Sequence, residues 1–201
     1  GTVTLAASTG ATHVGAVPPE PDTPEPDWPV RVLIAGDSTG AGLIAPMRQY
    51  ALDLPGRVEV FHSAFAGCGL TAAGDGRLHQ WNNEREWIDL SGCLTQWDGM
   101  VQRIGDEQID VVVVSTGIFD GNDIAFPDGR RTNLLDPAGR ALVESAYADF
   151  ADGIAATGAR IVWVTPPDID RGWDDLDDLL DDPVRWSTLR EIIADVDAVR
   201  A

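Results

Sequence analysis

Four short segments rich in apolar residues recur along the chain, and helical spacing or glycine-rich turns separate them. The segments cover residues 30–35, 58–63, 109–115 and 160–165, and the first is almost wholly apolar. Such a run is typical of a strand buried on both faces of a sheet. Strands that alternate with helices build a parallel sheet, so the pattern predicts a three-layer α/β/α domain.

Helices are expected over residues 39–52, over 94–104, from 136 to 158, and from about 183 onward. Asp136-Pro137 is a favourable helix start, with Asp as the cap and Pro in the first turn. The two long connections, 64–92 and 116–135, are expected to be loops. Before the first strand, the proline-rich, acidic residues up to 29 favour an extended linker. The predicted domains are therefore a disordered or extended linker, 1–29, and an α/β domain, 30–201.

The formal net charge of −19 argues against nucleic acid or an anionic membrane surface as a partner. No apolar run approaches the ~18 residues that a membrane span requires. Cys68 and Cys93 form no CxxC pair and have no histidine cluster near them, so we expect no metal site. From the residues alone, a disulfide and two buried thiols remain alternatives. The acids from Asp120 to Asp128 fail the calcium-loop pattern.

Ligands of such a fold bind beyond the carboxyl ends of the strands, which directs attention to the turns that follow them. Ser38 lies between a strand and a helix. The unpaired N–H groups of a helix start can stabilise the oxyanion that forms when a serine attacks an ester. The alternative is that Ser38 or Thr39 only caps the helix. Trp81, Trp87 and Trp97 could line a sugar site, although core packing is the commoner use of tryptophan.

Gly36-Asp37-Ser38-Thr39-Gly40 after the first strand resembles the first block of the SGNH (GDSL-like) hydrolases. The resemblance is greatest to the extracytoplasmic SGNH domains attached to membrane acyltransferases that O-acylate cell-surface glycans. It implies a flavodoxin-like SGNH fold without a cofactor, with Ser38 as nucleophile and its own N–H in the oxyanion hole. Gly67-Cys68-Gly69-Leu70 resembles the second block, which implies a donor at Gly67 or, alternatively, Gly69. The same resemblance implies a Cys68–Cys93 disulfide.

Two blocks depart from the family pattern. The third block, Gly-x-Asn-Asp, reads Gly117-Ile118-Phe119-Asp120 here, so Phe119 replaces a hydrogen-bond donor. Asn122 is an alternative donor if the loop shifts. Asp37, Gly117 and Asp120 remain candidate pocket residues.

The final block, Asp-x-x-His, is missing. The chain's histidines are His13, His62 and His79, and none has an aspartate three residues before it. We therefore expect a domain that lacks its C-terminal part, with an apolar strand exposed near 160–165. We also expect low activity, because a serine without a base is a weak nucleophile.

The first functional hypothesis is serine-dependent ester hydrolysis or O-acyl transfer on a cell-surface glycan or another small ester. The resemblance places that activity outside the cytoplasm, tethered to a membrane acyltransferase domain. A second hypothesis is a non-catalytic module that binds an acyl group or a sugar. A third is a flavodoxin-like binder of phosphate or FMN, because a helix start also receives phosphate.

Overall fold

The main sheet of the protein is parallel, as predicted. The computed structural model describes residues 28–72, 76–80, 86–117, 119–167 and 182–199. Its main strands are β1 (Val30–Gly36), β2 (Val58–Ala64), β5 (Val111–Ser115) and β8 (Arg160–Trp163). They pair in the order β2-β1-β5-β8. All four coincide with the apolar runs of the sequence, although β8 ends two residues earlier.

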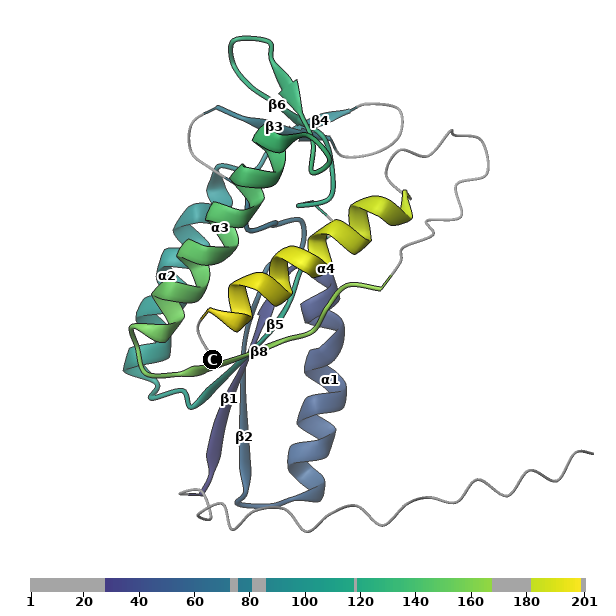
Figure 1. The fold of residues 1–201 in the computed structure, drawn as a ribbon. Helices are drawn as coiled ribbons and strands as arrows, with labels where there is room; N and C mark the ends of the chain where they lie inside the picture. Colours follow the sequence, from purple (N-terminus) through teal and green to yellow (C-terminus); the bar gives the residue numbers. More distant parts are fainter. Residues whose placement is uncertain (1–27, 73–75, 81–85, 118, 168–181, 200–201) are drawn as a thin grey trace, which may run out of the picture.

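Helices cover both faces of this sheet (Figure 1). They are α1 (Ser38–Asp53), α2 (Gly92–Asp106), α3 (Pro137–Ala155) and α4 (Pro183–Ala198). The α1 helix lies on one face, whereas α2 and α3 cover the other and α4 packs against α3. Aromatic rings pack α2 against α3 and join this helical layer to the sheet. The ring centroid of Phe150 on α3 lies 5.5 Å from that of Trp97 on α2 and 6.2 Å from that of Trp163 on β8. The predicted three-layer architecture is confirmed.

A second, antiparallel sheet lies beyond the carboxyl ends of the main strands (Figure 1). It consists of β3 (Leu78–Gln80), β4 (Trp87–Asp89), β6 (Ile124–Ala125) and β7 (Arg131–Thr132), in the order β4-β3-β6-β7. The expectation that both long connections are plain loops was therefore wrong. These strands are too short to show an alternating pattern, and they form because the two connections pair with each other.

The start of α3 also differs from its predicted form. Asp136 occupies the cap position, but its side chain makes no cap hydrogen bond. Its carboxylate instead accepts from the N–H of Asn133 at 3.2 Å and from the hydroxyl of Thr132 at 3.3 Å. The side chain therefore stabilises the turn before the helix, and the helix begins at Pro137.

The β8 strand forms one edge of the main sheet and exposes apolar side chains, as the sequence predicted. Val162 is 49% exposed and Val164, just beyond the strand, is 38% exposed. In the described part of the chain, no helix combines the length and the apolar character needed to cross a bilayer. The predicted linker lies outside the described residues except for Trp28 and Pro29, and so does the acidic segment 168–181.

Candidate functional site

Three candidate residues follow three neighbouring strands at the same edge of the main sheet. Gly36, the last residue of β1, pairs with Ala64 of β2 on one side and Ser115 of β5 on the other. Ser38, Gly67 and Gly117 lie two or three residues beyond these positions. The turns after β1 and β2 also contact each other, because the N–H of Phe65 donates to the carbonyl of Gly36 at 2.7 Å.

Ser38 is not the cap of the helix that it begins. Asp37 has an extended backbone and caps α1. Its Oδ1 accepts from the N–H of Thr39 at 2.8 Å and from the Thr39 hydroxyl at 2.6 Å. Ser38 itself is exposed, and its hydroxyl makes no hydrogen bond to another described residue. The capping alternative for Ser38 is therefore wrong, and this serine has no role within the local hydrogen-bond network.

Two backbone N–H groups in the turns after β1 and β2 have no acceptor within the described part of the chain. They belong to Ser38, at the first position of α1, and to Gly67, in the turn after β2. Gly67 has a φ of +84°, which a residue with a side chain rarely adopts, and it is half-buried. Unpaired donors at a helix start and in an adjacent turn are suited to an oxyanion.

Gly69, the alternative donor, has a packing role instead. A Cβ at this position would lie 2.5 Å from Oδ1 of Asp120. Its carbonyl accepts from the indole N–H of Trp97 at 3.3 Å, and the residue is buried. These contacts favour Gly67 over Gly69 as the residue that can face a ligand.

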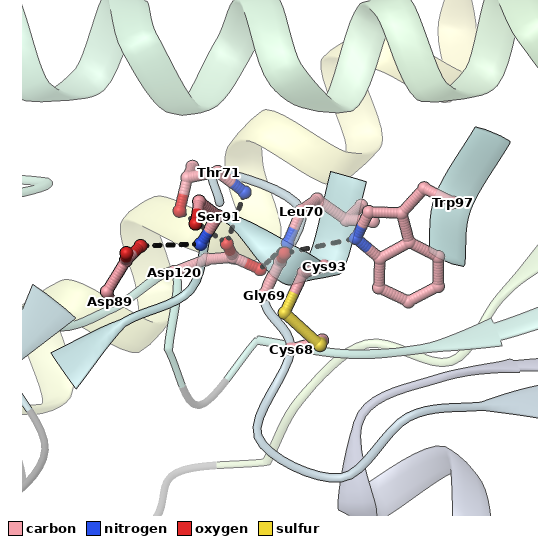
Figure 2. Close-up of a disulfide and its surroundings, with 9 residues drawn as sticks. All are labelled: Cys68, Gly69, Leu70, Thr71, Asp89, Ser91, Cys93, Trp97 and Asp120. Carbon is pink, nitrogen blue, oxygen red and sulfur yellow. Dashed lines mark hydrogen bonds between the residues drawn. A yellow bond between two sulfur atoms is a disulfide. The ribbon is translucent and has the colours of Figure 1, made fainter. Parts of the chain in front are cut away.

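Asp120 fixes the loop that carries these glycines (Figure 2). This fully buried carboxylate accepts from the N–H of Leu70 at 3.1 Å and from the N–H and hydroxyl of Thr71 at 2.9 and 2.7 Å. A fourth donor is the hydroxyl of Tyr147 on α3, at 2.9 Å. Burial raises the pKa of Tyr147 well above its usual value, and the adjacent Asp120 charge raises it further. Nothing in the sequence pattern links Tyr147 to Asp120, which lies 27 residues earlier in the chain.

Asp37 joins the turn after β1 to the turn after β5. Besides capping α1, it accepts from the N–H of Gly117 at 3.2 Å through Oδ2. Burial raises the pKa of Asp37, and the charge of Asp120 acts in the same direction, against hydrogen bonds from Thr39 and Gly117 that lower it. Asp37, Gly117 and Asp120 are thus buried beneath the candidate site, whereas Ser38 is exposed and Gly67 is half-buried.

The predicted disulfide between Cys68 and Cys93 is present, with the two Cα atoms 5.6 Å apart (Figure 2). It joins the residue after Gly67 to the first turn of α2. Gly67 is therefore followed at once by a covalent anchor and, within the next few residues, by the hydrogen bonds to Asp120.

The remaining candidates lie elsewhere. Phe119 is buried in the hydrophobic core. The side chain of Asn122 donates to the carbonyl of Gln80 in β3 at 2.7 Å, so Asn122 stabilises the small antiparallel sheet. His62 lies on β2 with an exposed side chain, and His79 lies buried in β3. Among the residues that the structure describes, no histidine bonds to Ser38. His13 lies outside them.

The acidic residues of the 120–128 segment bind separate partners. Asp123 pairs with the buried Arg185 at 2.8 Å, and Asp128 pairs with Arg130 at 2.6 Å. The described residues contain no group of three or more side chains arranged to hold a metal ion. Trp97 packs in the core and Trp87 stacks with Arg131, while Trp81 lies outside the described residues.

Comparison with known proteins identifies the fold of the chain. No family model matches the chain, and neither does any curated protein. Among solved structures, the crystal structure of TesA superposes with a TM-score of 0.50 at 15% identity, over 84% of this chain and 73% of TesA. The chain has the SGNH hydrolase fold. At this identity the likeness extends to the fold alone.

A second structure is the periplasmic domain of a lipopolysaccharide acetyltransferase from Salmonella ser. Paratyphi A. It superposes with a TM-score of 0.49 at 14% identity, over 83% of this chain. The match spans 63% of that domain, less than two thirds of its length. Within the SGNH fold, the Ser38 turn, the Gly67 turn and the Gly117 turn follow successive strands of the sheet.

Proposed function

We propose that this chain is a serine-dependent ester domain that hydrolyses or transfers an O-acyl group, with an acylated glycan or another small ester as substrate. One observation carries the proposal. Ser38 presents an exposed hydroxyl at the start of α1 that is free of any capping role, and the N–H groups of Ser38 and Gly67, in two turns that contact each other, have no acceptor among the described residues. A nucleophile and oxyanion donors are two of the three parts that serine-dependent acyl transfer uses, and the third is a base.

In the proposed reaction, Oγ of Ser38 adds to the ester carbonyl carbon, and the carbonyl oxygen takes up the negative charge. The N–H groups of Ser38 and Gly67 donate to that oxygen. Collapse breaks the bond to the alcohol, which leaves with the proton that Oγ released. Water or a second hydroxyl then removes the acyl group from Ser38. Because no described histidine bonds to Ser38 to accept that proton, we expect slow turnover from this chain alone.

We further propose that the chain works outside the cytoplasm, tethered to a membrane acyltransferase domain. The Cys68–Cys93 bond supports the location, because disulfides persist in oxidising compartments. The resemblance of the sequence motifs supports the tether. The phosphate-binding alternative is less favourable, because the buried carboxyl of Asp37 already accepts the Thr39 N–H that a phosphate would need.

Labelling by a fluorophosphonate tests the proposal. We expect the reagent to modify one residue, identified by peptide mass spectrometry as Ser38, and the Ser38→Ala variant to resist it. Ser145→Ala is the matched control, since Ser145 is an exposed serine on α3 whose bond to Asp149 is long at 3.5 Å. Modification of another residue, or equal modification of Ser38→Ala, would contradict the proposal. Ester binding without labelling would favour the non-catalytic module.

A further inference from the structure

A hollow of about 400 Å³ opens beside Gly67. Its wall includes Gly67 itself, the Cys68–Cys93 disulfide, Ile88 of β4 and Leu90. A Cβ placed on Gly67 would meet nothing within 4 Å, so this glycine borders open space. The hollow therefore begins at the residue whose N–H is the proposed oxyanion donor.

We propose that this hollow is an acyl pocket that receives a short, uncharged acyl group. The inference rests on the proposed function, because it assumes that the ester carbonyl lies at Gly67. With the carbonyl at Gly67, the hollow is an adjacent space that one substituent of the ester can enter. That wall begins at Cys68 and continues across the disulfide to α2.

The lining selects the acyl side of the ester over a sugar. Most of the wall is apolar, and only Asp89 and Gln96 contribute longer polar side chains. A sugar ring brings several hydroxyl groups that require partners, whereas an alkyl chain gains from contact with Ile88, Leu90 and the disulfide. Asp89 accepts from the N–H of Ser91 at 2.8 Å and is exposed, so its charge lies at the rim and repels an anionic acyl group.

The size of the hollow indicates a short acyl chain. Ligand pockets span roughly 300–1,000 Å³, so this one is at the small end of the range. A larger hollow of about 500 Å³ lies between α2 and α3, but Gly67 does not line it.

Gly92 allows the pocket to be filled without disturbing the fold. It lines the hollow from the first turn of α2, and a Cβ there would meet nothing within 4 Å. Gly99, on the same helix, has the same open surroundings and is outside the wall of this hollow. Gly92→Phe and Gly99→Phe are therefore matched variants, both expected to fold because each replaces a helical glycine that faces open space.

Binding is measured on Ser38→Ala, so that no turnover intervenes, by following the amide shifts of Gly67 and Ile88 during titration with neutral esters. Ethyl butanoate should shift both amides, and Gly92→Phe should weaken its binding by about tenfold or more, while Gly99→Phe changes it by less than about twofold. Monoethyl succinate should bind less tightly than ethyl butanoate. Equal binding to both phenylalanine variants, or no shift at these amides, would overturn the pocket.

The labelling of Ser38 in the parent chain separates this result from the proposed function. If ethyl butanoate binds as described but Ser38 resists the fluorophosphonate, the acyl pocket stands and the chemistry at Ser38 is refuted. If Ser38 is labelled but the amides do not respond, the chemistry stands and the pocket is refuted.

Discussion

Replacing Tyr147 with phenylalanine removes one oxygen atom from the most enclosed hydrogen bond of the site. Tyr147 is fully buried, and its hydroxyl donates to Asp120 at 2.9 Å. A hydrogen bond to a charged group contributes about 1.5–3 kcal/mol to the free energy of unfolding. Because phenylalanine fills nearly the same volume, little packing energy is lost. At ~2–4 °C per kcal/mol for a chain of this size, the melting temperature should fall by roughly 3–12 °C.

Thermal and urea unfolding, followed by circular dichroism, measure this loss. The chain contains 2 tyrosines, and the other one is a natural control. Tyr50 on α1 is 53% exposed, so Tyr50→Phe should change the free energy of unfolding by no more than about 0.5 kcal/mol. If Tyr147→Phe proves as stable as Tyr50→Phe, the hydroxyl does not support Asp120 and the loop in the way described here.

The same variant has an expected pH signature. Burial and Asp120 raise the pKa of Tyr147 above 10.0, so the native state keeps its phenolic proton at pH values where the unfolded chain loses it. The stability of the parent chain should therefore fall as pH rises above about 10, with a limiting slope near 1.4 kcal/mol per pH unit from this group. Tyr147→Phe lacks that contribution. Parallel stability curves for the two proteins above this pH would refute the assignment.

Three further outcomes are expected from unfolding measurements. Replacing both Cys68 and Cys93 with alanine should lower the free energy of unfolding by about 3.5 kcal/mol, the chain-entropy value for their 25-residue separation, and an unchanged urea midpoint would contradict this. Burial raises the pKa of Asp37 above 3.8, so the unfolded chain loses this proton at a lower pH than the native state does. The free energy of unfolding of the parent should therefore fall relative to that of Asp37→Asn as pH rises from about 4. The opposite trend would show that the native state favours the ionised form. Gly69→Ala should destabilise by about 1–3 kcal/mol, because the new methyl group would lie 2.5 Å from a carboxylate oxygen, whereas Gly99→Ala should not destabilise at all.

The main sheet was predictable from the sequence because each of its strands lies in a segment that is rich in apolar residues and long enough to be recognised. The small sheet was not, since β6 and β7 hold two residues each and form only where distant segments pair. Its residues carry no local pattern of their own. The structure of those connections therefore depends on tertiary contacts that a single sequence does not display.

The sequence predicted which turns carry the candidate site but not the hydrogen bonds within it. Asp37, Ser38 and Thr39 are all residue types that cap helices, so spacing alone could not decide which one does so. The extended backbone of Asp37 decides it. The bond between Asp120 and Tyr147 joins residues 27 apart, one in a turn and one within an apolar helical stripe. Only the packing of α3 against that turn brings them together.

In the proposed reaction, the two anchors after Gly67 lower the entropic cost of acyl transfer as well as stabilising the fold. On one side of the turn lies the end of β2, held in register with β1. On the other lie the disulfide at Cys68 and the hydrogen bonds of Leu70 and Thr71 to Asp120. A donor held this way loses little further freedom when it meets a developing charge, because folding has already ordered it. The turn is thus preorganised before any ester arrives, and loosening either anchor should slow acyl transfer even where substrate binding is unchanged.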